Sequence, residues 1–511
     1  MENVEWLPPE RIPDLSDAKE IAIDLETHDP GIKTKGPGWA RNEGKVIGVA
    51  VAVEGWKGYF PVAHEGGGNF DENFFKKSLK KILDLPCDKV FHNSSYDVGW
   101  LRQWGLETKG RIIDTMIAAP LIDENRTSQG KNYSLNDLAK EYLGERKKED
   151  ELYSKALEHG VDPKGEMHLL PAMVVGPYAE KDAELTLKLW NVFKPEIIKQ
   201  ELHNIFNLET DLLPLLIDIK WKGVRVDLEK ADQIKKDLAK KEKSILQQIK
   251  KDTGVNVEIW AASSVAKAFD SVGLSYSRTE KTNAPSFHKQ FLVNHSHDLP
   301  KMIVNAREIN KARTTFIDSI LRHEHKGRIH ADINQLKTET GGTVSGRLSM
   351  QHPNLQQIPA RHPELGPLIR SIFIPDENCT WGSFDYSQQE PRILLHFAAG
   401  INGGKGLRGT QELVDRYHQE DPDFHQAVAD IAGIDRKTAK TINLGLSYGM
   451  GKLKLGNELG LNKEETDVLF KKYHAQVPFL KKLTEEAMHW ANSSGYLRTL
   501  EGRRCRFDLW Q

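Results

Sequence analysis

Acidic residues in the first 200 positions stand at spacings that suit metal chemistry. Asp24 and Glu26 lie two apart in an apolar, strand-like stretch, so their side chains point to the same face. Two like charges on one face repel unless a cation lies between them, although strand ends often carry acids without one. Asp97 follows a second strand-like piece, and Tyr178 and Asp182 are neighbours at i and i+4 on a predicted helix. Three such elements in order rarely arise by chance.

The same residues resemble the proofreading 3′-5′ exonucleases of the DEDD superfamily, tyrosine subgroup, over about residues 17–195. The resemblance implies that two Mg²⁺ or Mn²⁺ ions are held by Asp24, Glu26, Asp97 and Asp182. It also implies that Tyr178 orients the attacking water. Asp114 is explained as the cap of the helix that follows it, and we leave it out of the site.

A second candidate site lies in the later half of the chain. Asp385 ends an apparent strand, and a helix-like stretch follows it to Ala398, which indicates a metal site with a substrate clamp. About forty residues later, basic, apolar and aromatic side chains recur every fourth residue, at Arg436, Lys440, Leu444 and Tyr448. Steps of four form one broad stripe on a helix, which can grip a triphosphate at one end and stack on a base at the other.

These two segments resemble the first two of the three signature motifs of family A DNA polymerases, the polymerase I type, over about residues 200–511. The resemblance implies that Asp385 and the carbonyl of Tyr386 bind two catalytic Mg²⁺ or Mn²⁺ ions. It implies nucleotide contacts for Gln388, Glu390, His425, Arg436, Lys440, Leu444 and Tyr448, with Glu390 selecting deoxynucleotides. For His425 a core histidine bonded to the backbone is the alternative.

Pro391 and Leu444 depart from the family pattern, which has leucine and an aromatic residue there. Proline is tolerated at the start of a helix, so Pro391 suggests a local backbone adjustment. Leu444 puts discrimination against sugar analogues in doubt.

The segment Thr343–Pro359 resembles the one that family A enzymes lay along the duplex minor groove. Arg347, Asn354 and Gln356 would bind the DNA there, because minor-groove acceptors occupy similar positions in every correct base pair. A turn capped by Gly346 and Ser349 is the alternative, and it explains only those two residues.

The third family motif, a His-Asp-Glu hairpin with a second metal carboxylate, is not found before Gln511. We therefore expect a phage-like proofreading polymerase represented by an incomplete chain, competent as an exonuclease but deficient in polymerisation alone. Its expected partners are primer-template DNA, deoxynucleoside triphosphates and a separately encoded or spliced carboxy-terminal fragment. A stand-alone exonuclease whose polymerase remnant only holds DNA and a non-catalytic DNA-binding subunit are the alternatives.

The elements that must position these residues indicate an α/β protein. Strand-like stretches at 20–25 and 46–53 predict a sheet covered by helices, a ribonuclease H-like exonuclease domain over 1–198. An incomplete right-hand polymerase domain is expected over 199–511, with a thumb at about 205–325, part of the palm at about 326–400 and fingers at about 401–511.

An apolar stripe on a long predicted helix at 228–252 comprises Ala231, Ile234, Leu238, Ile245 and Ile249. Eight lysines around it form either a solvated face or a thumb that grips the DNA backbone. A linker is expected near Ser275–His297, and a further strand is expected from Ile329.

Bulk composition sets loose limits. A formal charge of −2 gives no global signal for nucleic acid, so DNA contacts must come from local basic patches. Three scattered cysteines argue against a disulfide framework or a zinc ribbon and suit a reducing compartment. With no export signal and no long apolar run, we expect a cytoplasmic protein of a bacterial or phage-infected cell with no membrane partner.

Overall fold

The computed structural model describes residues 6–163, 165–337, 341–360, 362–401, 404, 406–419, 423–447 and 450–507. It contains two compact units, the first ending at Trp381 and the second beginning at Gly382. No helix among the described residues is both long and apolar enough to cross a membrane.

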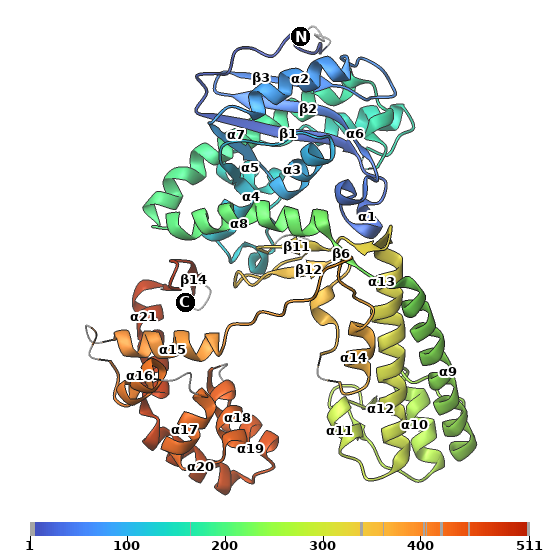
Figure 1. The fold of residues 1–511 in the computed structure, drawn as a ribbon, viewed down its shortest axis with the longest axis vertical. Coiled ribbons are helices and arrows are strands. Elements are labelled where there is room, and N and C mark those ends of the chain that lie inside the picture. Colours follow the sequence, from blue (N-terminus) through green and yellow to red (C-terminus); the bar gives the residue numbers. More distant parts are fainter. Residues whose placement is uncertain are drawn as a thin grey trace. The chain divides into compact units, whose positions relative to one another are not determined.

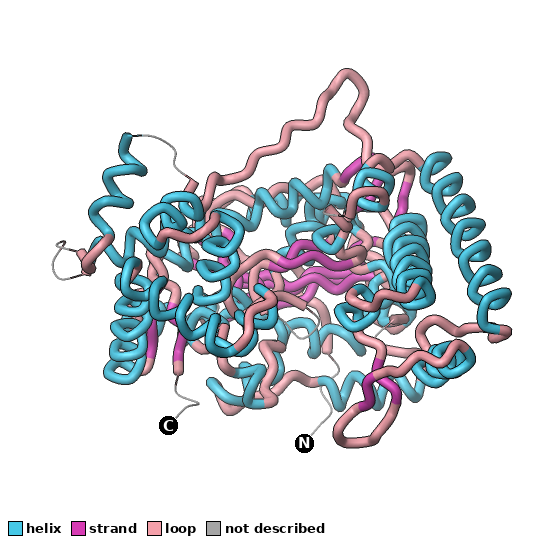
Figure 2. The backbone as a smooth tube through the Cα atoms, turned by 90° about the horizontal axis from the view of Figure 1, so that it is seen from below, coloured by secondary structure: helices cyan, strands magenta, loops and turns pink. Residues whose placement is uncertain are grey.

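A five-stranded mixed sheet forms the centre of the amino-terminal part of the first unit. Its strands, in the order β3-β2-β1-β4-β5, are Trp56–Pro61, Lys45–Val53, Glu20–His28, Asp88–Phe91 and Ile112–Asp114. The first three pair antiparallel, and β4 and β5 run parallel to β1. The strands appear side by side in magenta in Figure 2. Both strands predicted from the sequence, at 20–25 and 46–53, are confirmed.

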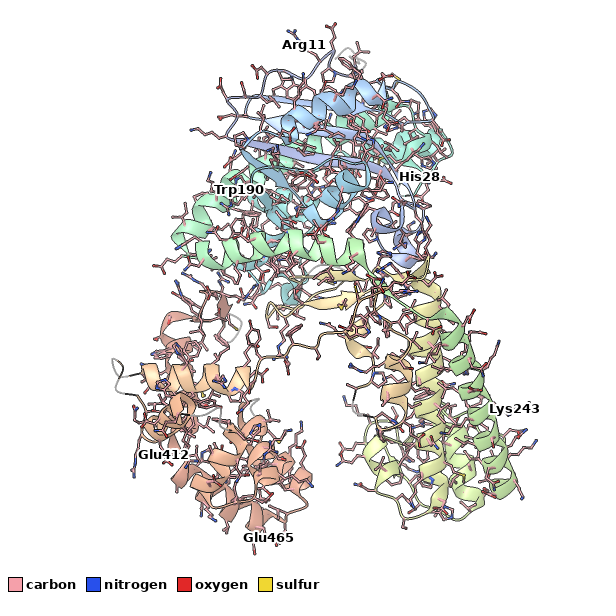
Figure 3. The ribbon with its side chains drawn as sticks, viewed as in Figure 1. Arg11, His28, Trp190, Lys243, Glu412 and Glu465 are labelled. Carbon is pink, nitrogen blue, oxygen red and sulfur yellow. The ribbon has the colours of Figure 1, made fainter. Side chains whose placement is uncertain are left out.

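Helices cover both faces of this sheet because alternate residues of β1 enter different cores. Ile21, Ile23 and Leu25 pack with α2 (Glu72–Leu83) and α3 (Ser94–Gln103), whereas Ala22 packs with α4 (Thr115–Ile122), α5 (Leu135–Tyr142) and α7 (Ala172–Lys199). Two further helices in this part are α1 (Ile32–Lys35) and α6 (Glu149–Glu158). In Figure 3 Trp190 lies on α7, and its Nε1 donates to Glu20 at 3.0 Å. The expected α/β class is confirmed.

Helices of very different lengths follow. They are α8 (His203–Lys222), α9 (Leu228–Thr253), α10 (Ala262–Ser271), α11 (Lys289–Val293), α12 (Asp298–Lys311) and α13 (Asp318–His323), with a π-helical turn at Ala312–Ile317. α9 packs against α12 (Figure 1). Four residues of the predicted stripe on α9 are buried, and Ile245 is half-buried. Lys243 is exposed on its outer side (Figure 3).

The linker expected at Ser275–His297 is wrong. This stretch forms the hairpin β7 (Ser277–Arg278) and β8 (Pro285–Ser286) and the helix α11. Its Phe287 and Leu292 are buried in a core with Phe269, so the segment is part of a packed core and not an exposed linker.

Short strands join the helices to the segment that carries the proposed minor-groove residues. β6 (Val224–Arg225), β9 (Glu324–His325) and β10 (Arg328–Ile329) form one small sheet, and β11 (Asp332–Asn334) pairs with β12 (Ser349–Gln351). The strand expected from Ile329 is therefore divided between β10 and β11. Helix α14 (Leu365–Arg370) follows.

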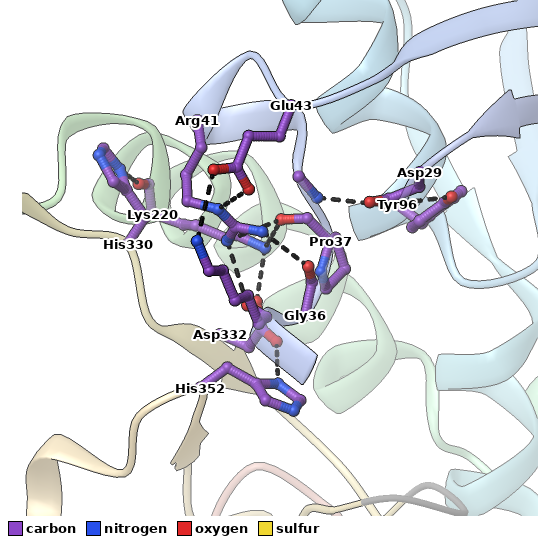
Figure 4. Close-up of polar contacts among 12 residues, drawn as sticks. Asp29, Gly36, Pro37, Arg41, Glu43, Tyr96, Lys220, His330, Asp332 and His352 are labelled. Atoms are coloured by element: carbon purple, nitrogen blue, oxygen red, sulfur yellow. Dashed lines mark hydrogen bonds and ion pairs between the residues drawn. The ribbon is translucent and has the colours of Figure 1, made fainter. Parts of the chain in front are cut away.

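A buried polar network ties the loop after β1 to α8 and β11 (Figure 4). Lys220 Nζ donates to Asp332 Oδ1 at 2.5 Å and to the carbonyl of Pro37 at 3.2 Å, and both charged side chains are buried. Arg41 donates to the carbonyls of residues 35–37 and to Glu43. Gly36 has φ 71°, and a Cβ there would collide with Asp332, so glycine is needed for this close approach.

The second unit is mainly helical. Its helices are α15 (Gln389–Gly400), α16 (Thr410–Gln419), α17 (Phe424–Ala432), α18 (Arg436–Ser447), α19 (Lys452–Leu459), α20 (Lys463–Gln476) and α21 (Pro478–Ser494), and β13 (Tyr496–Arg498) pairs with β14 (Arg504–Arg506). They enclose one core that includes Leu395, Phe424, Ile442 and Tyr473. The strand expected to end at Asp385 is wrong: residues 374–386 form no strand, because no described segment pairs with them.

Replacing Lys220 by Met should lower the free energy of unfolding by about 3–5 kcal/mol, because the buried Asp332 would lose its ammonium partner and keep the contact with His352 Nδ1 at 2.8 Å. Urea unfolding of the purified chain measures this. Lys222→Met, at an exposed position on the same helix, controls for loss of one charge. A loss under about 1 kcal/mol would contradict a buried pair that holds these segments together.

Candidate functional site

Three of the predicted acids meet between β1 and α7. Asp24, Glu26 and Asp182 each offer a carboxylate oxygen, and these atoms all lie within 4.8 Å of one another. Asp24 and Glu26 follow Ala22 at steps of two on the face of β1 that packs against α7, which explains why they point at Asp182. Glu26 and Asp182 are buried, and Asp24 is half-buried.

Asp97 stands beside this group, in the first turn of α3. Its Oδ1 accepts a hydrogen bond from the backbone N–H of Leu25 at 3.0 Å. β4 pairs with β1 only as far as Ala22, so the edge of β1 beyond that residue is open to a side chain. Burial raises the pKa of Asp97, and the nearby charge of Asp24 raises it further. Asp97 therefore lies near the group of three acids, close enough to feel the charge of Asp24.

Tyr178 and Asp182 lie one turn apart on α7, as predicted, and a lysine joins them. Lys147 Nζ lies 2.5 Å from Asp182 Oδ2, donates to Tyr178 Oη at 2.8 Å and stands 4.7 Å from the centre of the phenol ring. Lys147 was not predicted from the sequence. It lies between α5 and α6 in the run Arg146-Lys147-Lys148, and nothing in that run distinguishes the one lysine that turns inward.

Burial and mutual repulsion raise the pKa values of the acids. Burial, and then the charge of Asp182, raises the pKa of Asp24 to about 7. Burial raises the pKa of Glu26 well above its usual range, and the charges of Asp24 and Asp182 add to this. Burial would lower the pKa of Lys147, but the attraction of Asp182, Asp24 and Glu26 outweighs it and raises that pKa. The group therefore favours any added positive charge.

The group fits divalent cations. Asp182 Oδ1 is buried and has no hydrogen-bond partner among the described residues, while Oδ2 is held by Lys147. A buried carboxylate oxygen with no donor is costly unless a cation can reach it. Oxygen-only ligands suit Mg²⁺ or Mn²⁺ rather than zinc.

Asp114 has the capping role predicted for it. Its carboxylate accepts from the N–H of Met116 at the start of α4 and also from Ser94 and Asn93 at the start of α3. These bonds fix the starts of two helices, as a capping role requires.

The predicted minor-groove residues Arg347, Asn354 and Gln356 are all exposed. Asn354 Oδ1 accepts from the N–H of Gln356, and Gln356 donates to the carbonyl of Leu348 at 3.0 Å. Gly346 has φ 79°, and Ser349 Oγ accepts from Gly342. The turn that was the alternative is thus present, and it presents the three side chains on the surface. Their DNA contacts stay a prediction.

The stripe on α18 is exposed as far as the structure describes it. Arg436, Lys440 and Leu444 are exposed, and Tyr448 lies outside the described residues. Arg436 forms an ion pair with Asp423. His425 bonds to the side chain of Asn443 at 3.1 Å rather than to the backbone. The positive charges of Lys440 and Arg436 act on His425, although burial is the main reason why its pKa is lowered.

Around Asp385 the structure shows a looser arrangement. Asp385, Tyr386 and Glu390 are exposed, and no cluster of possible metal ligands forms at Asp385 within the part of the chain that is described. Gln388 Oε1 accepts from the N–H of Phe424 at 2.6 Å and from Tyr417 Oη at 3.0 Å, so it links α15 to α17 and α16. Pro391 is the third residue of α15, where its missing N–H has no helical partner to lose.

Comparisons with known proteins cover most of the chain. A family model described as DNA polymerase family A matches residues 228–510, and one described as 3′-5′ exonuclease matches residues 9–198. The chain is 36% identical to a DNA-directed DNA polymerase of Pseudomonas phage M6, across 98% of this chain and 83% of that one. It is 29% identical to DNA polymerase I of Pseudomonas aeruginosa, across 96% of this chain and 53% of that one.

A solved structure shares the fold. It is the POL domain of Pol1 from M. smegmatis in complex with a DNA primer-template and dNTP, with a TM-score of 0.75 and 20% identity. The likeness covers 96% of this chain and 78% of that one.

The raised pKa of Asp24 makes the metal-free protein sensitive to pH. Between about pH 4 and pH 7 the folded chain keeps a proton that the unfolded chain has lost, so stability falls as pH rises through this window. Asp24→Asn should remove this loss and be more stable than the wild type by roughly 1–3 kcal/mol at pH 8. Urea unfolding in EDTA at several pH values measures it, with the exposed Asp150→Asn as control. If the difference in free energy of unfolding between Asp24→Asn and the wild type did not change with pH, the raised pKa of Asp24 would be refuted.

Proposed function

We propose that this chain, which belongs to DNA polymerase family A and carries a 3′-5′ exonuclease domain, removes mismatched 3′ ends at the group of Asp24, Glu26, Asp97 and Asp182. The observation that carries this is the convergence of the acids, with Asp182 Oδ1 buried and unpartnered within the described structure. We assign the exonuclease domain to 1–198 and the polymerase domain to 199–511, with thumb, palm part and fingers at about 205–325, 326–400 and 401–511.

The four carboxylates would hold two Mg²⁺ or Mn²⁺ ions, which supply activation of the attacking water and charge neutralisation at the phosphate. Tyr178 would orient that water, because its hydroxyl lies within reach of Asp182 at the edge of the acidic group. Placing these groups on a strand and two helices keeps their positions fixed while a single-stranded 3′ end enters.

Asp24→Ala should slow the shortening of a labelled single-stranded DNA 3′ end by on the order of 10²–10³, because one ligand of the cations that stabilise the transition state is lost. Gel assays with Mg²⁺ and with Mn²⁺ measure the rate. Glu158→Ala changes an exposed acid on α6 and should leave the rate unchanged. A fully active Asp24→Ala protein would refute the assignment.

For the polymerase domain we propose that the stripe on α18 binds the incoming nucleotide, together with His425, Gln388 and Glu390. Its support is that Arg436, Lys440 and Leu444 share an exposed helix surface near His425. Tyr448 would complete the stripe, and Asp385 and Tyr386 would hold the metal ions. Arg347, Asn354 and Gln356 would contact the primer-template. We expect the protein to act in the cytoplasm of a bacterial or phage-infected cell.

We further propose that these 511 residues alone add nucleotides poorly and gain activity from a carboxy-terminal fragment with a His-Asp-Glu hairpin. The support is that Asp385 is exposed and forms no described ligand group, so bound cations would be shared mainly with water.

Primer extension with Mg²⁺ and deoxynucleotides should be slower by about 10² or more without such a fragment than with it. The matched control is the same fragment with the hairpin aspartate changed to alanine. Efficient extension by the 511 residues alone would show that a second carboxylate is not needed. No gain with the fragment would favour a stand-alone exonuclease whose polymerase portion only binds DNA.

A further inference from the structure

We propose that Lys147 is a positioning residue of the exonuclease site, which holds one oxygen of Asp182 and the hydroxyl of Tyr178 and leaves the other Asp182 oxygen for a cation. This inference rests on the exonuclease function proposed above. Lys147 adds a fixed positive charge to a site whose other members are acids and a phenol.

The contacts of Lys147 divide the carboxylate of Asp182 into two unequal oxygens. Oδ2 lies 2.5 Å from the ammonium, whereas Oδ1 is buried with no hydrogen-bond partner in the described structure. Because Oδ2 is held, the carboxylate cannot rotate to offer both oxygens to one ion. Lys147 therefore leaves Asp182 one oxygen, Oδ1, for a cation, in a group where one carboxylate oxygen each of Asp24, Glu26 and Asp182 lie within 4.8 Å of one another.

The same ammonium fixes Tyr178. It donates to the phenol oxygen at 2.8 Å and lies over the ring at 4.7 Å. The ammonium also pairs with Asp182, so it bridges the phenol and the carboxylate. A hydroxyl held by a fixed ammonium has less freedom to move, which suits a group that must direct a water molecule.

The backbone explains why this lysine turns inward. The N–H of Lys147 donates to Asn136 Oδ1 at 3.1 Å, which anchors the residue to α5. Its side chain is 14% exposed, whereas that of Lys148 is 49% exposed and pairs only weakly with Glu151 at 4.0 Å. Two adjacent lysines thus differ in environment, and Lys148 is a natural control.

Removing the charge of Lys147 should change cation binding and reaction rate in opposite directions. Without the ammonium the acidic group is more negative, so it attracts a divalent cation more strongly. Tyr178 and Asp182 lose their fixed orientation at the same time, which slows the reaction. A residue that merely supports the fold would weaken both properties together.

The test compares Lys147→Met, Lys147→Gln and Lys147→Arg with Lys148→Met. Mn²⁺ binding without DNA is measured by titration calorimetry, and single-turnover digestion of a single-stranded 3′ end is measured at saturating Mn²⁺. For Lys147→Met we expect Mn²⁺ to bind about 3–10-fold tighter and digestion to be about 10–100-fold slower. Lys147→Arg should keep wild-type Mn²⁺ affinity but digest slowly, because a planar guanidinium cannot replace a compact ammonium. Lys148→Met should match the wild type in both.

A double variant isolates the contact with the phenol. In a Tyr178→Phe background, Lys147→Met should slow digestion much less than it does in the wild type, since the two residues act as one unit. Independent, multiplicative effects would overturn that part of the inference.

Melting in EDTA confirms that each variant is folded, and Lys147→Gln replaces Lys147→Met if the latter is not. Unchanged affinity and rate, or a parallel loss of both, would overturn the proposal. If the wild type itself does not shorten 3′ ends, the proposed function fails, whereas tighter Mn²⁺ binding by Lys147→Met would still support the role of Lys147 toward the cation.

Discussion

Repulsion among four carboxylates in a small, largely buried space is the constraint around which the amino-terminal part is arranged. Such a group is tolerable only when the elements that carry it are held from both sides. β1 is covered by helices on each face, α3 is fixed at its start by Asp114, and α7 is packed along its length. One ammonium, that of Lys147, offsets part of the charge. The negative charge that remains at the site favours the binding of a divalent cation.

The acids themselves were predictable because local spacing encodes their geometry. A step of two on a strand and a step of four on a helix both place side chains on one face, and Asp24, Glu26, Tyr178 and Asp182 obey these rules. The apolar stripe of α9 and the cap at Asp114 follow from equally local patterns. No local rule brings residue 24 to residue 182. The contact between β1 and α7 was therefore expected from the family resemblance alone.

Other features depend on contacts that a linear pattern does not contain. Lys147 differs from Lys148 only in which way the chain turns after α5. The stretch before Asp385 has the composition of a strand, but a strand exists only with a neighbour to share its hydrogen bonds. Gln388, expected at the nucleotide, also joins three helices, a role that becomes visible only when Tyr417 and Phe424 are placed beside it.

The network of Arg41, Lys220 and Asp332 has a mechanical consequence for the first unit. It fastens the loop after β1 to the segment that leads into Arg347 and Asn354, and to swing one away from the other would expose or orphan a buried pair at a cost of about 3–5 kcal/mol. Within the first unit the loop and the segment are therefore expected to move as one piece, and a domain boundary placed between residues 37 and 332 would cut through a packed, charged interior rather than a hinge.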